Sequence, residues 1–584
     1  MAPPVPGLEV LRSYKARWLP RDVVAGLVLT ALLVPQGMAY AELAGLPAIT
    51  GLYTSILCLL GYAAFGPSRI LVLGPDSSLG PMIAATILPL AGADGDPARA
   101  VALASMLALM VGAITCLTGL AGLGFVADLL SKPTTIGYMN GLALTILVGQ
   151  LPKLFGFSVD ADGLIAELKG WILGLVHGET VGAALAVGVF ALVLILALGH
   201  WMPRLPAVLI AVVASILAAS VFHLADHGVS LTGTLPRGFP PFTVPHVRLS
   251  DVGLLFGGAA GIALVSLADT ISTATSFAAR TGQEVDGNRE MIGIGAANIA
   301  AGFFQGFPVS TSGSRTAVAE QAGARTQVTG VVGAGAIILI LVVVPGLLRN
   351  LPQPTLAAVV MAAALSLADI RGTRELFRWR RTEFSLSIAA FLAVALLGVL
   401  PGIVVAVALS IGNVFRRLWW PNQAVLGRVP ETGGFQDVGL HPEAEQLAGC
   451  VVFRFDAPLF FANSRAFRER IRALADADPP PEWIVVAAEP ITDVDTTAAD
   501  MLEDLDIDLN ARGISLVFAE MKDPVREKIE RYELTRTIDP SHFFPTLDAA
   551  VAAFRSRPPA PPAAAGAHPA EASSGGTPGG GGSA

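Results

Sequence analysis

The chain has 584 residues, of which 53% are hydrophobic and only 14% are charged, and its mean hydropathy is +0.63. So few charges over this length exclude an ordinary water-soluble enzyme and indicate a membrane protein. The net charge of -8 argues against nucleic-acid binding. The three cysteines are too widely separated for a disulfide framework or a metal cluster, and the histidines have no zinc-type spacing, so no enzymatic site stands out.

Long apolar stretches follow one another from about Val23 to Leu418, and many reach the roughly 17 to 25 residues that a membrane-spanning helix needs. The first stretch has no convincing cleavage site, so we expect a retained span rather than a signal peptide. The clearest full spans are Val101–Gly124, Val181–Leu198, Ala207–Leu224, Val328–Leu348 and Phe384–Leu400. Residues 1–421 are therefore predicted to form an α-helical polytopic membrane domain with about fourteen crossings or half-crossings, about seven in each half.

The basic residues predict an orientation, because Lys and Arg collect in the cytoplasmic loops of membrane proteins. With the N-terminus inside, most cations fall in inner loops, including the run Arg371, Arg374, Arg378, Arg380 and Arg381. We therefore expect a multi-pass protein of the plasma or inner membrane with both termini in the cytoplasm.

The first half contains an interrupted span. Arg69–Leu73 favours an extended chain, Gly74-Pro75 cannot continue a helix, and a helical pattern restarts at Ser77 and runs through Leu88. A helix would thus begin inside the membrane, where its free N–H groups and its dipole attract an anion.

A second interruption lies at the corresponding place of the other half. Pro308 blocks a helix, Ser310–Ser314 are good capping residues, and Arg315–Gln321 can start a new helix. Interrupted helices at matched positions of two halves point to a transporter's binding site. The serines of both breaks offer hydroxyl groups, and Arg315 adds a charge suited to an oxyanion. The alternative is a pair of kinks whose serines only cap the backbone.

Carboxylates in and near these spans are the next candidates. Asp76 either caps the restarting helix or points into the site, where it would weaken anion binding. Asp269 lies in the otherwise apolar span Gly261–Ala279, where a buried carboxylate is costly and functional by default. Thr273, four residues on, and Ser266, three before, share its helical face. Asp269 is predicted to carry a proton, to bind sodium with these hydroxyl groups, or to form a static ion pair with Arg315.

The first span contains two further polar candidates. Gln36, just after the kink at Pro35, is predicted to bind an anion through its amide. Glu42 either faces the same side as Gln36, as a coupling residue, or reaches the helix end and solvent.

The composition changes after Trp420-Pro421. Strand-like Cys450–Phe455, Trp483–Ala488 and Ile514–Ala519 alternate with helix-like Ser464–Leu474, Thr496–Ala511 and Val525–Leu534. Residues 422–557 are thus predicted to form a cytosolic α/β domain. Residues 558–584 consist mainly of Pro, Ala, Gly and Ser, so we expect a disordered tail.

Several ordered motifs closely resemble the sulfate permease (SulP) family of anion transporters. In the first half these are residues 33–47 (LVPQGMAYAELAGLP) and 51–53 (GLY); in the second half they are 285–290 (VDGNRE), 295–298 (GAAN), 314–317 (SRTA) and 322–326 (AGART). The resemblance covers about residues 15 to 556.

This resemblance implies a seven-plus-seven inverted repeat, with a core domain of spans 1–4 and 8–11 moving against a gate domain of spans 5–7 and 12–14. It also implies a C-terminal STAS domain, a homodimer, and an anion held between the third and tenth spans with help from the first. The family's anion site falls on Gln36, Ser77, Ser78, Ser312, Gly313, Ser314 and Arg315.

The loop of residues 491–498 resembles the Asp-Ser-Ser-Gly loop of STAS domains, in which a hydroxyl can be phosphorylated. Thr496 is the closest positional match, although Ala498 replaces the usual glycine. Asp495 and Thr496 are also ordinary helix-capping residues. We expect this domain to regulate transport by docking or by binding a cytosolic partner.

These features predict a secondary active transporter of small anions that works by proton-coupled symport and alternating access. Sulfate is the first choice only because the resemblance to the family implies it. Asp269 with Thr273 resembles the sodium-coupled bicarbonate branch of the family, whereas Gly313 stands where that branch has a threonine. A sodium-coupled bicarbonate or dicarboxylate symporter, an uncoupled exchanger or channel, a nucleobase permease and a nontransporting sensor remain open. No cofactor is expected besides a coupling proton or sodium ion.

Overall fold

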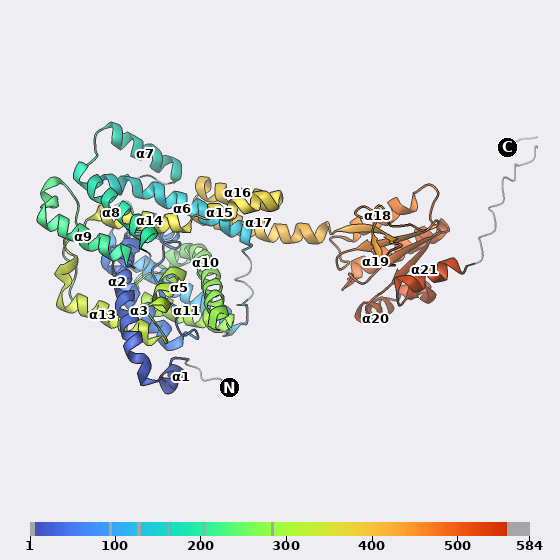
Figure 1. Cartoon of the computed structure of the whole chain (residues 1–584), viewed down its shortest axis with the longest axis horizontal. Helices are drawn as coiled ribbons and strands as arrows, with labels where there is room; N and C mark the ends of the chain where they lie inside the picture. The colour runs from blue at the N-terminus through green and yellow to red at the C-terminus, as the bar shows by residue number, and fades with distance from the viewer. Residues whose placement is uncertain are drawn as a thin grey trace, which may run out of the picture. The chain divides into compact units, whose positions relative to one another are not determined.

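The computed structural model describes residues 6–92, 96–124, 130–159, 161, 163–202, 205–281, 285–431 and 433–557. The predicted tail, 558–584, lies outside these residues. Contacts divide the chain into two compact units, Met1–Gly412 and Asn413–Ala584, each with its own hydrophobic core (Figure 1).

The first unit is helical. Its first-half helices are α1 (Pro6–Ser13), α2 (Leu19–Leu43), α3 (Ala48–Phe65), α4 (Gly80–Ala91), α5 (Pro97–Leu120), α6 (Lys132–Phe155), α7 (Leu164–Val176), α8 (Gly182–Trp201) and α9 (Ala207–Val221). Its second-half helices are α10 (Leu249–Thr281), α11 (Gly287–Gly302), α12 (Gly313–Gln321), α13 (Val328–Val343), α14 (Gln353–Leu367), α15 (Ile370–Trp379), α16 (Arg381–Leu397) and α17 (Val399–Trp419), the last of which runs into the second unit.

Within the described residues, seven helical stretches are long and apolar enough to cross a bilayer, and α4, α9 and α13 are shorter apolar helices. Each predicted full span corresponds to one helix: α5, α8, α9, α13 and α16. The span predicted to reach Leu348 ends at Val343, because Pro345 cannot follow inside a helix.

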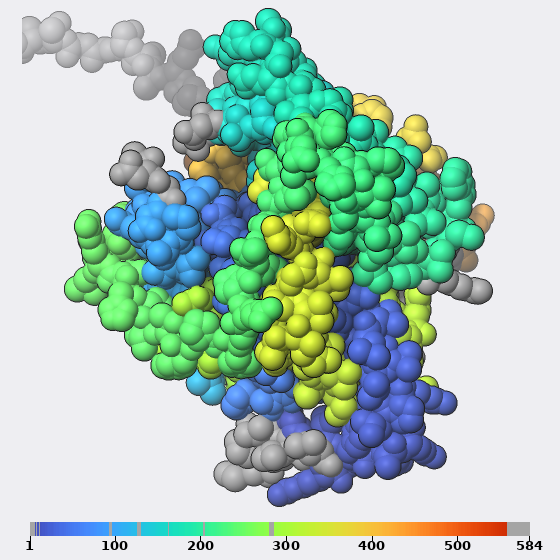
Figure 2. Space-filling model, turned by 90° about the vertical axis from the view of Figure 1, so that its left-hand side faces the viewer, coloured from blue at the N-terminus to red at the C-terminus, as the bar shows by residue number. Residues whose placement is uncertain are grey.

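The outward surface of α8 and α9 is apolar, and it forms part of the face shown in Figure 2. Phe190 and Val193 are 50% and 58% exposed, and Leu217 is 59% exposed. Large apolar side chains in such a continuous exposed patch fit contact with lipid chains rather than water.

The helices of the first unit pack closely through small residues. α2 packs on α3, α11 on α3 and α5, and α6 on α14 and α16. At the α2–α3 crossing, a Cβ on Gly51 would lie 1.9 Å from the carbonyl oxygen of Gly37. Only glycine allows the two backbones to approach this closely.

Two short strands join the halves of the first unit. β1 (Leu73–Gly74) pairs antiparallel with β2 (Ser310–Thr311), with Leu73 opposite Thr311 and Gly74 opposite Ser310. The amide of Ser312 extends the ladder by donating to the carbonyl of Val72 at 3.1 Å. This pairing brings the two interrupted segments side by side, since the strands immediately precede α12 and the turn that leads into α4.

The second unit contains a six-stranded sheet in the order β4-β3-β5-β6-β7-β8. Its elements are β3 (Gln423–Arg428), β4 (Phe435–Asp437), β5 (Cys450–Phe455), α18 (Ser464–Ala475), β6 (Trp483–Ala487), α19 (Thr496–Ala511), β7 (Ser515–Ala519), α20 (Asp523–Arg531), β8 (Phe543–Phe544) and α21 (Leu547–Arg555). Alternate strand residues fill two cores, one beneath α18, α19 and α20 and the other beneath α21. The predicted α/β alternation is therefore confirmed, whereas β3, β4, β8 and α21 were not predicted.

Candidate anion-binding site

The first interrupted segment turns before it becomes helical. The prediction that a helix restarts at Ser77 is wrong, because α4 begins at Gly80. Asp76 Oδ1 accepts hydrogen bonds from the backbone N–H of Ser78 at 2.9 Å and from its hydroxyl at 2.8 Å. This local turn competes with the helix and delays it by three residues. Asp76 therefore closes the turn before α4 and does not cap α4 itself, whose N-cap is Leu79.

The second segment ends in an open helix N-terminus. Ser312 is the N-cap of α12, and its Oγ accepts a hydrogen bond from the amide of Arg315 at 3.4 Å. Gly313 and Ser314 are exposed, and within the described residues no acceptor takes their backbone N–H groups. The hydroxyls of Ser312 and Ser314 lie 3.1 Å apart beside them. This end of α12 therefore offers two free amides and two hydroxyls to an anion.

Arg315 lies beneath this helix end rather than at its surface. Its side chain is 1% exposed, and its Nη2 donates to Asp76 Oδ2 at 3.4 Å. Nε and Nη1 have no partner among the described residues. A Cβ on Gly74 would lie 2.6 Å from Nη1, so the glycine makes room for the guanidinium. The alternative of an Asp269–Arg315 ion pair is wrong, because the paired β1 and β2 place Asp76 next to Arg315.

α10 places Asp269 and Thr273, the candidate coupling-ion residues, near the start of α12 and the turn before α4. Asp269 Oδ2 lies 3.4 Å from the hydroxyl oxygen of Ser78, so Ser78 lies between Asp269 and Asp76. The position of a Cβ on Gly313 is 4.0 Å from Thr273 Oγ1. Asp269 and Thr273 thus face the starts of α4 and α12 from one side of α10, as the spacing predicts.

Ser266 is hydrogen-bonded to the segment that carries β2. Its hydroxyl donates to the carbonyl of Val309 at 2.9 Å, and the neighbouring Thr270 hydroxyl accepts a hydrogen bond from that of Thr311 at 3.3 Å. These two residues attach α10 to the segment that carries β2. That Ser266 joins Asp269 and Thr273 in binding sodium stays a prediction.

α2 contributes differently from the prediction. Gln36 is half-buried beside Pro35, and no hydrogen bond of its side chain occurs in the part of the chain that the structure describes. Tyr40, one turn later, is buried, and its hydroxyl interacts with the side chain of Ser77. Sequence reasoning missed Tyr40, although its spacing of four from Gln36 places both on one helical face.

Glu42 lies elsewhere. It lines a cavity of about 560 Å³ with Lys153 and Thr232, whereas the predicted anion-site residues do not line this cavity. Lys153 Nζ donates to the backbone carbonyl of Glu42 at 3.4 Å. Six residues separate Gln36 from Glu42, which turns the two side chains about 120° apart on the helix. The prediction that they face the same side is therefore wrong.

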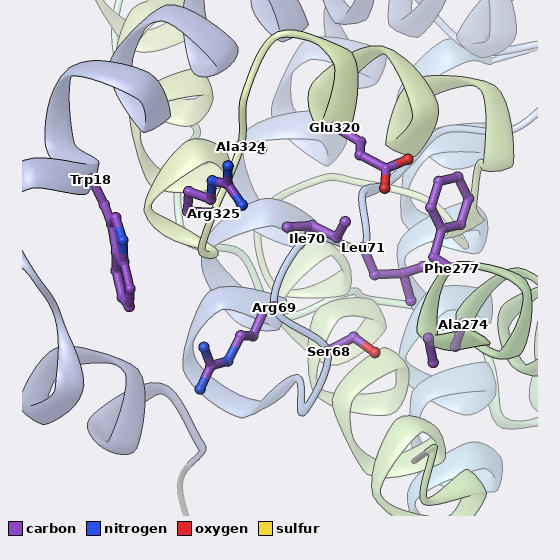
Figure 3. A pocket seen from close by; sticks show the side chains of 11 residues that line it. Trp18, Ser68, Arg69, Ile70, Leu71, Ala274, Phe277, Glu320, Ala324 and Arg325 are labelled. Carbon is purple, nitrogen blue, oxygen red and sulfur yellow. The ribbon is translucent and has the colours of Figure 1, made fainter. Parts of the chain in front are cut away.

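A second cavity, of about 450 Å³, continues along the elements of the candidate site (Figure 3). Ala274 and Phe277 line it from α10, Glu320 from α12, and Leu71 from the segment before β1. Figure 3 shows Arg69 and Arg325 entering from two different loops, with Glu320 near Phe277. The cavity is therefore lined by both charged and apolar groups.

In the second unit, Thr496 is the exposed first residue of α19. Asp495 is the N-cap, and its Oδ1 accepts a hydrogen bond from the amide of Ala498 at 2.8 Å. Its Oδ2 accepts another from the amide of Phe461 at 2.9 Å. The capping interpretation of Asp495 is confirmed, and phosphorylation of Thr496 stays a prediction.

The sequence matches the family model of the "Sulfate permease family" over residues 19–390 and the family model of the "STAS domain" over residues 441–550. The chain belongs to the sulfate permease family. A probable sulfate transporter of Mycobacterium tuberculosis (strain ATCC 25618 / H37Rv) is 43% identical over 553 residues, covering 94% of this chain and 98% of that protein. Sulfate transporter 1.3 of Arabidopsis thaliana is 30% identical over 572 residues, covering 94% and 86%.

Solved structures show the same fold for this member of the sulfate permease family. The murine Solute Carrier 26 family member A9 anion transporter in its inward-facing state has a TM-score of 0.87 at 24% identity, covering 95% of this chain and 94% of that chain. The transmembrane domain of a cyanobacterial bicarbonate transporter has a TM-score of 0.60 at 20% identity, covering 67% and 98%. The protein is thus an integral membrane protein with a helical membrane unit and a C-terminal STAS domain, as the motifs imply.

Proposed function

We propose that this sulfate permease is a secondary active transporter of small anions, with sulfate as the first choice. The observation that carries the proposal is the open N-terminus of α12, where the amides of Gly313 and Ser314 lack acceptors among the described residues. Ser78 and Asp269 reach the same region from α4's turn and from α10. The two relatives above are named as sulfate transporters, which favours sulfate among the oxyanions.

The charges around this region favour coupling to a cation. Arg315 is already paired with Asp76, and Asp269 adds a second carboxylate. A dianion entering beside two carboxylates and one arginine would be repelled unless a positive charge enters with it. Symport of a proton with the anion offsets this repulsion.

The geometry suggests where the proton binds. The Ser78 hydroxyl has one proton, which it donates to Asp76 Oδ1 at 2.8 Å, leaving Asp269 Oδ2 at 3.4 Å without a donor from Ser78. A proton on Asp269 would let that carboxyl donate to Ser78 Oγ and complete a chain of hydrogen bonds from Asp269 to Asp76. Loss of this proton would restore the repulsion and favour release of the anion.

Alternating access completes the proposal. We infer a seven-plus-seven repeat in which the elements carrying α4, α10 and α12 form a core domain that moves against a gate domain. The cavity that Ala274 and Phe277 line is the candidate path from the site to one side of the membrane. Cytoplasmic termini, a homodimer and a cytosolic regulator at the STAS domain remain predictions.

The test is uptake of radiolabelled sulfate, bicarbonate and fumarate into proteoliposomes, with a proton gradient or a sodium gradient imposed separately. Sulfate is expected to accumulate with the proton gradient. Asp269→Asn is expected to abolish this accumulation while sulfate exchange without a gradient persists. Asp251→Asn is the matched control, because Asp251 is a buried carboxylate of the same helix that pairs with Arg99 at 3.5 Å instead. Full accumulation by Asp269→Asn would mean that the coupling proton binds elsewhere, whereas no accumulation by the wild type would indicate an uncoupled exchanger or channel.

A sodium-coupled symporter of bicarbonate or a dicarboxylate is the second candidate. Thr273 shares a helical face with Asp269, and Gly313 leaves open space beside its hydroxyl. A carboxylate and a hydroxyl oxygen are ligands that a small hard cation accepts. Uptake driven by a sodium gradient and lost in Thr273→Val would favour this function, whereas competition by uracil would indicate a nucleobase permease.

A further inference from the structure

Helix α15 is set apart from the helices around it by a cap at its start. Asp369 Oδ1 accepts a hydrogen bond from the amide of Gly372 at 2.7 Å, and the Asp369 amide donates to Asn140 of α6 at 2.7 Å. A Cβ on Gly372 would lie 2.2 Å from Asp369 Oδ2, so the cap requires this glycine. α15 is therefore a separate short helix between α14 and α16, anchored to α6.

One face of α15 is buried and another is largely exposed. Gly372 and Leu376, four residues apart, are buried, and the helix packs on α6 and α16. Ile370 and Phe377, seven residues apart on another face, are 77% and 56% exposed. Trp379 at the end of the helix is 71% exposed. Large apolar side chains this exposed, next to membrane-spanning helices, indicate an apolar environment around that face.

The remaining face of α15 and the start of α16, which follows it directly, are cationic. Residues 370–383 contain five arginines and two glutamates. Glu375 pairs with Arg371 at 3.1 Å and Glu383 with Arg380 at 3.3 Å. Arg374, Arg378 and Arg381 are exposed and have no carboxylate partner among the described residues.

We propose that α15 lies in the headgroup layer of the membrane and binds anionic phospholipid. Ile370 and Phe377 would enter the acyl boundary while the three unpaired arginines hold lipid phosphates. A short amphipathic helix with arginines and aromatic residues is the form that interfacial helices take, and guanidinium groups bind phosphate with two parallel hydrogen bonds. The excess of positive charge on this segment complements an anionic leaflet.

The bound lipid would also hold part of the membrane unit together. Phe377 contacts Phe384 of α16 with ring centroids 5.1 Å apart, and α15 connects α14 to α16. Lipid bound on α15 would thus restrain the ends of both helices. The chemistry of the headgroup, rather than the transported anion, is what this surface selects.

The experiment is a titration of the full chain, purified in detergent, with fluorescent phosphatidylglycerol and, separately, fluorescent phosphatidylcholine. Each arginine near an anionic headgroup contributes about fivefold in affinity, so the wild type is expected to bind phosphatidylglycerol roughly a hundredfold more tightly. The variant R374Q/R378Q/R381Q is expected to bind both lipids about equally, and R374K/R378K/R381K to keep the preference.

The matched control is R465Q/R470Q/R526Q, which removes three exposed arginines from the soluble domain. It is expected to keep the preference for phosphatidylglycerol. Equal binding of the two lipids by the wild type, or an unchanged preference in R374Q/R378Q/R381Q, would overturn the proposal. A preference that the soluble-domain control also loses would contradict it as well, and would point to charge effects outside α15.

Discussion

The buried ion pair between Asp76 and Arg315 allows a sharp test of how the site is built. At 3.4 Å two unit charges attract by about 5 kcal/mol at an effective dielectric constant of about 20. Asp76 keeps 15% of its side chain exposed, which places the expected cost of breaking the pair at the lower end of the range for buried pairs, about 3 kcal/mol. Arg315→Met and Asp76→Asn should each lose about this much stability, because each leaves one buried charge unpaired.

The double variant D76N/R315M removes both charges and is expected to be nearly as stable as the wild type. The measurement is thermal unfolding of the detergent-purified full chain for the four members of this double-mutant cycle, which are the wild type, Asp76→Asn, Arg315→Met and the double variant. The control is the same pair of single variants and their double variant at the exposed pair Arg465–Glu469, at 2.7 Å, whose coupling should be too small to measure because water screens both charges. Additive losses in D76N/R315M would refute the reasoning, because they would mean that the two side chains act independently.

Asp76 also cancels part of the charge that Arg315 offers to an anion. Asp76→Asn is therefore expected to tighten sulfate binding and Arg315→Ala to weaken binding of every anion, each by roughly tenfold. Gly313→Val should leave folding intact but weaken sulfate binding, because its side chain fills the open space at α12. Gly51→Ala should destabilise the membrane unit by about 3 kcal/mol or more through its clash with Gly37, whereas Gly335→Ala, with open space around it, should be neutral. In the STAS domain, burial raises the pKa of Asp506 to about 6, so its ionised form destabilises the domain above that pH. Asp506→Asn should stabilise the isolated domain by up to about 3 kcal/mol near pH 8 and by nothing at about pH 2, where the carboxyl is protonated whether folded or not.

Each of these predictions has an outcome that would contradict it. Unchanged sulfate affinity in both Asp76→Asn and Arg315→Ala would remove the pair from the anion site. Normal sulfate binding by Gly313→Val would place the anion away from α12. Equal stability of the two glycine variants would mean that the α2–α3 crossing tolerates a methyl group. If Asp506→Asn raised the free energy of unfolding by the same amount at every pH, ionisation of the Asp506 carboxyl would not be what destabilises the domain.

Local patterns predicted the STAS domain well. β5 and α19 have the bounds expected from strand alternation and capping, since these signals depend on neighbouring residues. The start of α4 was placed three residues too early, because the side chain of Asp76 forms a turn that the helical pattern does not reveal. Glu42 was assigned to the wrong face because six residues do not complete two helical turns.

By itself the sequence determined the membrane class, the two interrupted segments and the family. Hydropathy, Gly-Pro breaks and ordered motifs are local signals, because each depends only on residues that are close together in the sequence. Only the tertiary structure decided which charges meet. Asp76 pairs with Arg315 across 239 residues, and Ser78 reaches Asp269 across 191. The packing of β1, β2 and α10 determines these partners, and the residues around a carboxylate in the sequence do not indicate which distant cation it will pair with.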